Sequence, residues 1–479
     1  MKMFIGGAER DARDGKTIDV LNSATQEFID TIPYATEEDV NEAIEAAQIG
    51  KKVWAATPVH ERCRIMMKCA DAVDARREEI ARMLSTEMGK IIREARAEIR
   101  VCAQILRGFA EAAAHHYGHT MTEYQIGTEN DIIFTRHEPL GVVACISPFN
   151  YPVELCTQKM AAALATGNAV IVKPASDNPL ALMTVIKICL EQGIPGNVLQ
   201  VVTGSGQKVG ALLSQSPLID AISLTGSTEV GVDVAQKGAK TLKHVFLELG
   251  GNDPFIVLDD ADIEKAVAEA ASGRLQNAGQ TCCSPKRFIV HESLHQAFVD
   301  GLLERFKHVH HGSPLDDETE YGCLINKKAA LEVQRQVELT VAQGAKLLCG
   351  GKPYQETYFE PTILDGVTMD VDVATDMEVF GPVFPIITFK TDEEAIEIAN
   401  ATKYGLQAGV MTRSMNRAMR VASQLQCGGV VINSSGNYRH MDQPFGGTKM
   451  TGLGREGVSV TLSEMTQEKS YILKGILAK

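Results

Sequence analysis

The sequence is informative first through what it lacks. Its 479 residues contain no run of 18 consecutive apolar residues, which is about the least that a transmembrane helix needs. The net charge is −14, so the chain has no basic excess with which to attract the phosphates of a nucleic acid. The first residues soon become charged and include no apolar core of a signal peptide. These absences argue against a membrane span and against a nucleic-acid partner.

Cysteine pairing and metal binding are not indicated either. The eleven cysteines are scattered, odd in number and never in a CxxC spacing, so we expect reduced thiols in a cytoplasmic protein. Histidines gather at 115–119 and 308–311 but have no matching frame of Cys or carboxylate side chains. We therefore expect no metal site.

The length and the hydrophobic pattern predict several α/β units. A chain of this length exceeds a single core, so two or three domains are expected. Residues 58–117 have the composition of a nearly continuous helical region. Short apolar runs then alternate with helical stretches, which is typical of parallel strands covered on both faces. The runs are residues 141–146, 169–172, 198–202 and 221–224, then 254–258, 287–290, 384–387 and 429–432. The fold class is therefore α/β, with two doubly wound α/β domains.

Two polar segments far apart in the sequence have the character of exposed strands. Residues 120–137 and 464–473 mix polar and β-branched side chains, and we expect them to pair with each other. Exposed strand edges need covering, and a partner subunit provides such a cover. A homodimer or homotetramer is therefore expected.

The most distinctive local feature is the pentapeptide Gly279–Cys283, which is separated from the motif Phe246–Gly251 by a predicted helix. Together the two motifs place a thiol and the carboxylate of Glu248 on the flanks of that helix. A thiol can add to a carbonyl carbon, and a carboxylate can take a proton from water. Two adjacent cysteines alone are more often small buried hydrophobes. The combination with the carboxylate favours an enzyme that forms a thioester and hydrolyses it.

Four further motifs follow predicted strands. Gly204–Gly210 resembles a dinucleotide fingerprint with one extra residue, although a tight strand-to-helix turn also explains it. Thr225–Gly231 offers free N–H groups to a phosphate, or is a plain helix cap. In residues 146–152 two prolines stiffen the backbone around Asn150, whose amide can stabilise an oxyanion or simply form a turn. Lys173 ends another strand, where it can meet a nucleotide ribose or stay solvated.

In this order the motifs SPFNYP, IVKPAS, LTGSTEVG, ELGG, NAGQTCC, EVFGPV and PFGGTKMTGLGREG resemble the aldehyde dehydrogenase superfamily along nearly the whole chain. The resemblance implies a Rossmann-like NAD(P)-binding domain at residues 1–119 and 138–247. It also implies a catalytic domain at 248–445 and a small β oligomerisation arm at 120–137 and 460–479. The implied cofactor is NADP or NAD, and the implied partner is a small-molecule aldehyde.

The resemblance assigns catalytic roles residue by residue. Cys282 would be the nucleophile and Cys283 a bystander, with Glu248 as the general base. The amide of Asn150 and the backbone N–H of Cys282 would stabilise the oxyanion of a thiohemiacetal. Hydride transfer to the nicotinamide and hydrolysis of the thioester would follow.

Cofactor contacts are implied in the same way. Lys173 and Glu378 would hold the two riboses, Gly226 and Ser227 would meet the pyrophosphate, and Phe380 would lie against the nicotinamide. The full set of residues implied in cofactor binding is Ser147, Phe149, Lys173, Ser176, Gly206, Gly210, Gly226, Ser227, Glu378 and Phe380.

The chain departs from familiar members in two places. Many NAD-specific relatives carry an acid where this chain has Ser176, so we expect NADP to be accepted and hypothesise a preference for it, although Asp177 stands beside it. Succinate-semialdehyde enzymes place arginines where this chain has Gln158 and Gln276, whereas Arg439 lies in a loop that lines substrate pockets in relatives. The pattern favours a short polar aldehyde, hydroxy- or acid-bearing.

Two alternative functions were weighed against hydrolytic aldehyde oxidation. A CoA-acylating semialdehyde dehydrogenase would also form a thioester, but such relatives generally lack a base at the position of Glu248. A catalytically silent structural member of the fold would have lost Cys282 or Glu248, and both are present. The sequence therefore favours water as the acceptor of the acyl group.

Overall fold

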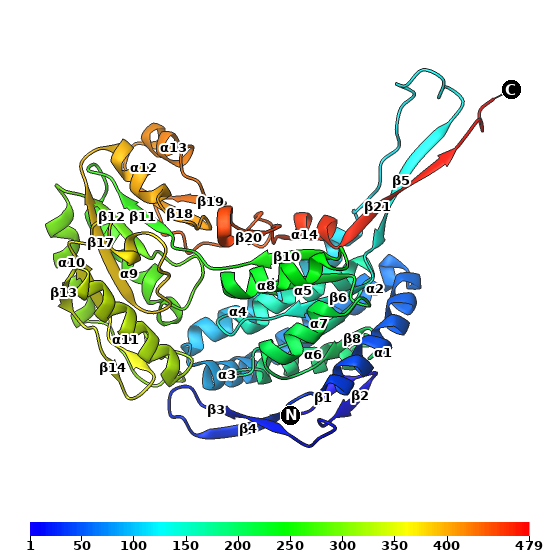
Figure 1. Cartoon of the computed structure of the whole chain (residues 1–479), viewed down its shortest axis with the longest axis horizontal. Helices are drawn as coiled ribbons and strands as arrows, with labels where there is room; N and C mark the ends of the chain where they lie inside the picture. Colours follow the sequence, from blue (N-terminus) through cyan, green and yellow to red (C-terminus); the bar gives the residue numbers. More distant parts are fainter. Residues whose placement is uncertain (479) are drawn as a thin grey trace.

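The computed structural model describes residues 1–478 and contains two large sheets, each flanked by helices (Figure 1). The first sheet has eight strands in the order β2-β1-β8-β7-β6-β9-β10-β20, and the second has seven in the order β13-β16-β17-β12-β11-β18-β19. Helices line both faces of the parallel part of each sheet (Figure 1). The predicted fold class, with two doubly wound α/β units, is confirmed.

The first sheet is parallel in its centre and antiparallel at its edges. Its strands are β1 (Met3–Ile5), β2 (Ala8–Arg10), β6 (Val142–Ile146), β7 (Ala169–Lys173), β8 (Leu199–Val201), β9 (Ala221–Thr225), β10 (His244–Glu248) and β20 (Gly452–Leu453). Alternate residues of β6 enter different cores, with Val143 on one face and Ala144 on the other. A strand buried on both faces reads as a continuous apolar run, which is why the sequence located these strands.

Helices of the first unit begin and end where local signals place them. Thr36 caps α1 through a reciprocal capping box with Asp39. The region predicted as nearly continuous helix is divided into three helices, and Gly89 ends one of them in the left-handed conformation. The helices are α1 (Glu37–Ala56), α2 (Val59–Ala75), α3 (Arg77–Met88), α4 (Ile92–Ala113), α5 (Pro152–Thr166), α6 (Leu180–Glu191), η1 (Gly206–Gly210), α7 (Ala211–Gln215), α8 (Thr228–Ala239) and α14 (Val458–Glu464).

The second sheet is parallel except for its edge strand β13. Its strands are β11 (Pro254–Val257), β12 (Arg287–His291), β13 (Lys346–Cys349), β16 (Thr362–Asp365), β17 (Val383–Phe389), β18 (Gln407–Met411) and β19 (Gly429–Ile432). The helices of this unit are α9 (Ile263–Leu275), η2 (Gln276–Gly279), α10 (His295–Lys307), α11 (Lys327–Ala342), η3 (Asp372–Ala374), α12 (Asp392–Asn400), α13 (Met415–Ala422) and η4 (Lys449–Thr451).

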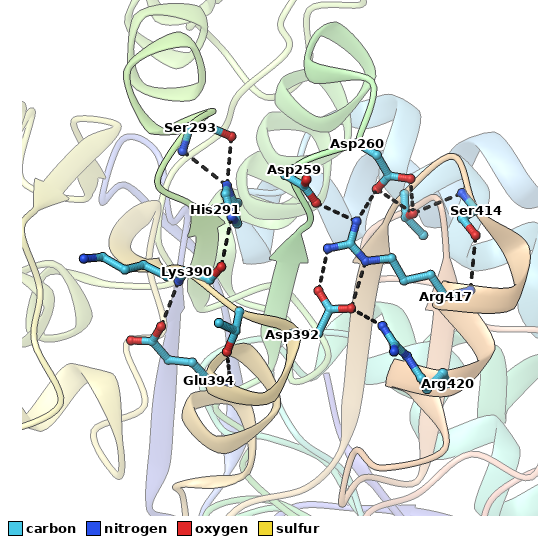
Figure 2. A network of polar contacts seen from close by, with 12 residues as sticks. Asp259, Asp260, His291, Ser293, Lys390, Asp392, Glu394, Ser414, Arg417 and Arg420 are labelled. Carbon is cyan, nitrogen blue, oxygen red and sulfur yellow. Dashed lines mark hydrogen bonds and ion pairs between the residues drawn. The ribbon is translucent and has the colours of Figure 1, made fainter.

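A network of charged side chains occupies the carboxyl edge of the second sheet, which is the side on which its parallel strands end (Figure 2). Arg417 of α13 lies between Asp392 at the start of α12 and Asp259 and Asp260 after β11, with nitrogen–oxygen distances of 2.5, 2.5 and 3.1 Å. Arg420 forms a second pair with Asp392. The network ties two helices to the loop that follows a central strand.

The predicted strand pairing between distant segments is present. Strands β5 (Ile132–Pro139) and β21 (Thr466–Leu473) pair antiparallel along their whole length and project from the first unit (Figure 1). The pairing begins only at Thr466, because the preceding residues form α14, which packs against α4 and α5. Two further small hairpins are β3 (Thr17–Leu21) with β4 (Phe28–Pro33) and β14 (Pro353–Tyr354) with β15 (Tyr358–Phe359). Among the described residues, no helix is both long and apolar enough to cross a membrane.

Candidate active site

The carboxyl edge of the first sheet gathers most of the predicted site residues. Strand β6 lies between β7 and β9, so the chain reverses its direction of winding there. Ligands of open α/β sheets bind at such a switch point, outside the carboxyl ends of the strands. Asn150 follows β6, Gly226 follows β9, and Glu248 is the last residue of β10. The strand order therefore brings together three residues that are far apart in the sequence.

The nucleophile loop enters this crevice from the second unit. Between α9 and Cys282 the chain makes a left-handed turn, in which Asn277, Ala278 and Gly279 have φ values of 50°, 54° and 77°. Such a conformation costs about 1–2 kcal/mol for each residue that carries a Cβ. Gly279 has no alternative, because a Cβ there would lie 2.3 Å from the carbonyl oxygen of Gly381. Surrounding contacts must hold this turn in place.

Hydrogen bonds join the turn to the loop that carries Asn150. The Asn150 Nδ2 atom donates to the carbonyl oxygen of Gln280 at 3.1 Å. In return, Asn277 Nδ2 donates to the carbonyl oxygens of Asn150 and Gln280, at 3.0 and 3.2 Å. The Gln280 side chain accepts from the backbone N–H of Ile325 at 2.9 Å. The two units thus meet through a closed network of amides beside Cys282.

One cavity of about 430 Å³ contains the reactive groups. Cys282, Glu248 and Asn150 line it together with residues of both units. The predicted cofactor residues that line the same cavity are Phe149, Gly226, Ser227, Glu378 and Phe380. The thiol, the carboxylate and the amide therefore face a common space that extends toward the predicted nucleotide site.

Glu248 is poised to exchange a proton near neutral pH. Burial raises its pKa to about 7, and the negative charge of Glu456 adds to this effect, while Lys159 and the thiol of Cys282 oppose it. The thiol of Cys282 lies close enough to lower the pKa, but neither carboxylate oxygen accepts a hydrogen bond of normal geometry within residues 1–478. A carboxylate with such a pKa and free oxygens is suited to general-base work at neutral pH.

The thiol of Cys282 has an environment that favours its protonated form. The adjacent Cys283 thiol, burial and the charge of Glu248 all raise its pKa, whereas Lys286 lowers it. The Lys286 ammonium donates to the carbonyl oxygens of Thr281, at 3.1 Å, and of Cys282. The thiol is therefore protonated at neutral pH unless a base removes its proton. Cys283 is buried and donates to Asn437 Oδ1 at 3.5 Å.

The remaining predicted cofactor residues lie along the same sheet edge. Burial lowers the pKa of Lys173 to about 8, and its ammonium donates to the carbonyl oxygen of Pro174 at 2.9 Å. Ser176 Oγ donates to the carbonyl oxygen of Gly204 at 3.0 Å. The Ser147 hydroxyl donates to the carbonyl oxygen of Pro152 at 2.9 Å, so it braces the Asn150 loop.

Two predicted glycines and two other cofactor residues have distinct surroundings. Gly206 and Gly210 bound the π-helical turn η1, and a Cβ on either would meet no atom within 4 Å. Glu378 accepts from the backbone N–H of Gly251 at 3.2 Å and pairs with Lys286 at 3.2 Å. The Phe380 ring packs edge-on against Phe149, with their centroids 5.9 Å apart, and both residues line the cavity.

The three predicted substrate residues have contacts of different kinds. Gln158 is buried with an unpartnered Oε1 and lies beside a small void that Glu248 also lines. Gln276 accepts a hydrogen bond from Asn437. Arg439 donates to Glu456 at 2.6 Å, and its guanidinium lies 4.4 Å from the centroid of the Phe445 ring. None of the three lines the cavity of about 430 Å³.

Sequence reasoning missed several residues that shape this site. Lys286 donates to the carbonyl oxygen of Cys282. The only feature of the sequence that could have indicated this contact is the short spacing between the two residues. Glu456 joins Lys159 and Arg439 in one buried ion cluster, and their charges hold its pKa at about 2 despite burial. This cluster joins residues about 300 positions apart, so no local pattern indicates it. Within residues 1–478 no group of three or more His, Cys, Asp or Glu side chains is placed to hold a metal ion.

Comparison with known proteins identifies the family. The model of the aldehyde dehydrogenase family matches residues 10–471, so the chain belongs to that family. It is 37% identical to the lactaldehyde dehydrogenase of Methanococcus maripaludis, over 99% of this chain and 100% of that protein. It is 39% identical to the glutarate-semialdehyde dehydrogenase of Pseudomonas putida, over 97% of this chain and 96% of that protein.

Solved structures agree with this assignment. An NADP-dependent enzyme of Escherichia coli has a TM-score of 0.95 at 35% identity, covering 99% of this chain and 98% of that one. An NAD-dependent aldehyde dehydrogenase of Sinorhizobium meliloti has a TM-score of 0.96 at 35% identity, covering 100% and 95%. The protein is an aldehyde dehydrogenase whose cofactor is NAD or NADP.

Proposed function

We propose that this enzyme oxidises a short polar aldehyde to its carboxylic acid through a thioester on Cys282. The observation that carries the proposal is the shared cavity, in which Cys282, Glu248 and Asn150 lie beside the predicted cofactor residues Glu378 and Phe380. A nucleophile, a base and an amide donor in one enclosed space suffice for acyl transfer to water.

The residues at the sheet edge fit an NAD(P) molecule. The buried Lys173 ammonium donates to one carbonyl oxygen, which leaves donors for a ribose hydroxyl. Ser227 caps α8, whose first N–H groups face the predicted position of the pyrophosphate. Glu378 presents its carboxylate to the same cavity. When bound, the nicotinamide supplies the hydride acceptor for the redox step.

Formation of the thioester begins with Cys282. Glu248 takes the thiol proton, and the sulfur then adds to the aldehyde carbon to give a thiohemiacetal. The second N–H of the Asn150 amide and the backbone N–H of Cys282 stabilise the oxyanion. Each well-placed donor of this kind contributes about 3–4 kcal/mol in comparable sites.

Hydrolysis of the thioester depends on the same carboxylate. Loss of the aldehyde hydrogen as hydride to a bound cofactor would convert the thiohemiacetal into the thioester, and Glu248 would release the thiol proton to solvent. In its ionised form Glu248 then takes a proton from a water molecule, and the resulting hydroxide attacks the thioester carbon. The thiolate of Cys282 leaves and the carboxylic acid is released. A pKa of about 7 keeps a substantial fraction of Glu248 ionised at neutral pH. Water as the acceptor distinguishes this proposal from a CoA-acylating enzyme.

The proposed substrate class rests on the residues at three positions outside the cavity that contains the thiol. Gln158 and Gln276 stand where a dianionic product pocket would need arginines, and Arg439 is already paired with Glu456. Such surroundings favour a hydroxylated aldehyde first and an acid-bearing aldehyde second. The relatives that carry the names lactaldehyde and glutarate-semialdehyde dehydrogenase support both kinds of substrate.

We also propose a homo-oligomer in the cytoplasm. The projecting arm exposes apolar side chains, with Tyr124 and Ile126 each 96% exposed and Ile472 62% exposed. A second subunit is a suitable cover for these groups and for the edges of β5 and β21. All eleven cysteines are unpaired, which suits a reducing compartment. We also propose that the chain is divided into the cofactor, catalytic and arm segments that the sequence predicts.

The test is NAD(P)H formation at 340 nm with a panel of aldehydes. Glycolaldehyde and lactaldehyde represent hydroxylated substrates, succinate and glutarate semialdehydes represent acids, and propanal and benzaldehyde represent apolar ones. We expect the highest kcat/KM for the first group, with no stimulation by added CoA. A preference for propanal or benzaldehyde, or a requirement for CoA, would contradict the proposal.

A further inference from the structure

The left-handed turn before the nucleophile has an anchor in the other unit of the protein. The backbone N–H of Asn277 donates to both carboxylate oxygens of Glu94, at 3.2 and 3.1 Å. Glu94 lies in the first turn of α4, 183 residues away in the sequence. This pair of contacts holds the first residue of the strained turn. The side chain of the same Asn277 belongs to the amide network around Asn150, so the two sets of contacts meet at one residue.

The anchor acts on a segment whose geometry decides where the thiol lies. Asn277 and Ala278 both have positive φ values although neither is glycine. Residues in this region keep such a conformation only where their surroundings impose it. The chain runs from this turn directly to Gln280 and Cys282, and Asn277 also donates to the carbonyl oxygen of Asn150. A relaxed turn would therefore displace the thiol and the amide donor together.

The cationic neighbours of Glu94 and the N–H of Asn277 oppose the effect of its burial. Burial raises its pKa to about 7, while the charges of Lys90 and Arg93 and the N–H of Asn277 lower it, and Glu98 raises it. Glu98 itself is paired with the buried Lys90 and accepts from the N–H groups of Val153 and Glu154 at the start of α5. The first turns of α4 thus hold the nucleophile turn through Glu94 and the Asn150 loop through Glu98.

We infer that Glu94 is a positioning residue of the active site, which keeps the left-handed turn formed so that Cys282 and Asn150 stay aligned. The inference rests on the proposed roles of those two residues. Glu94 touches no reacting atom in this arrangement, so its effect is on the rate of the chemical step and not on substrate affinity.

The experiment compares Glu94→Ala with Glu264→Ala. Glu264 lines the same surface groove as Glu94, but its side chain is exposed and does not contact the turn. We expect Glu94→Ala to lower kcat roughly 10- to 100-fold, as misplacement of reacting groups does, with KM changed less than about twofold. Glu264→Ala should leave both constants at their wild-type values.

A second substitution tests whether backbone strain is the reason. Glycine adopts positive φ without a steric penalty, so Ala278→Gly removes part of the strain that Glu94 opposes. We expect the double variant Glu94→Ala/Ala278→Gly to recover most of the lost kcat. Hydrogen exchange of the peptide that spans residues 276–283, measured without substrate or cofactor, should be faster in Glu94→Ala and slower again in the double variant.

The outcomes separate this inference from the proposed function. Faster exchange with unchanged kcat would show that the turn is loosened without consequence, which overturns the positioning role. Unchanged exchange would show that Glu94 does not hold the turn at all, and it also overturns the inference. A fall in kcat that glycine does not rescue would mean a role other than relief of strain. If Cys282→Ser retained full activity, the proposed function would fail regardless of the exchange result.

Discussion

The two sheets of this enzyme follow the same plan but use their carboxyl edges in opposite ways. In the first sheet, the residues after β6, β9 and β10 surround a cavity that includes Asn150 and Glu248. In the second sheet, the residues after β11, β17 and β18 bind one another, with Arg417 held between Asp260 and Asp392 (Figure 2). Cys282, the predicted nucleophile, instead lies at the opposite side of the second sheet, just before β12 begins.

The difference shows that a shared topology does not by itself determine where function lies. The switch point predicts a crevice at the carboxyl ends of a doubly wound sheet. In the second sheet the same edge carries ion pairs and the Ser414 cap of α13, which attach helices to strands. Substitutions at the carboxyl edge of the first sheet are therefore expected to change the reaction rate, and substitutions at that of the second sheet to change the stability of the fold. The predictions below test this division.

The largest effect is expected at the thiol. Cys282→Ser should lower kcat for aldehyde oxidation by roughly 10³-fold or more, because the hydroxyl is a far weaker nucleophile at this site. Cys283→Ser is the matched control and should keep activity within about threefold, since a serine hydroxyl can also donate to Asn437. Steady-state rates with lactaldehyde measure both. Equal losses in the two variants would show that the roles of the adjacent thiols are misassigned.

Glu248→Gln should lower kcat by about 10²–10⁴-fold, because an amide cannot act as a base. In the wild type, activity requires the ionised carboxylate, so the rate should fall as the pH drops through about 7 and level off above it. The variant should lose this inflection. A pH–rate profile for both forms is the measurement, and a wild-type inflection near the ordinary pKa of a carboxyl would contradict the effect of burial.

Asn150→Ala should lower kcat by about 10²–10³-fold through loss of an oxyanion donor. The loss also removes one contact with the carbonyl oxygen of Gln280, so thermal unfolding should be recorded in parallel. Asn150→Asp is a useful second variant, because it keeps the size of the side chain and removes the N–H donors. An activity that survives both changes would exclude the amide from the reaction.

Ser176→Glu should change cofactor choice. A carboxylate at this position repels the additional phosphate of NADP, so kcat/KM for NADP should fall about tenfold or more, while that for NAD stays within about threefold. Initial rates with both cofactors at one aldehyde concentration decide the matter. A wild-type enzyme that uses only NAD would refute the hypothesis that Ser176 permits NADP.

The smallest effect on rate is expected at the carboxyl edge of the second sheet, where Arg417 lies. Arg417→Ala leaves Asp259, Asp260 and Asp392 without their shared partner and should cost roughly 1–3 kcal/mol of stability. The variant should unfold several degrees lower in a thermal melt but keep its kcat at 25 °C. A large loss of kcat without a change in unfolding temperature would erase the contrast between the two edges.

Prediction from sequence succeeded where the physical signal is local. The run Val142–Ile146 is buried on both faces, so its continuous hydrophobicity predicted a strand. The approximate location of the paired arm was also visible, although α14 occupies residues where the arm was expected to begin. Periodicity does not distinguish a short helix that is held by tertiary packing from the strand that follows it.

The rest could not be read from the sequence, because it depends on contacts between distant residues. The bond between Glu94 and Asn277 and the cluster of Lys159, Glu456 and Arg439 each join segments that no local pattern connects. The raised pKa of Glu248 depends on burial, which a motif does not report. Motifs therefore indicated which residues are predicted to react, but not their protonation states or the contacts that hold them in place.

The predicted reacting groups are divided between the two units, and this division has a consequence for their alignment. Glu248 and Asn150 belong to the first unit, whereas Cys282 is carried by the second. The distance between the predicted base and the predicted nucleophile is therefore set by the contacts between the units, among them the hydrogen bonds that Asn150 and Asn277 form. A substitution that loosens those contacts would change the alignment of groups that it does not touch.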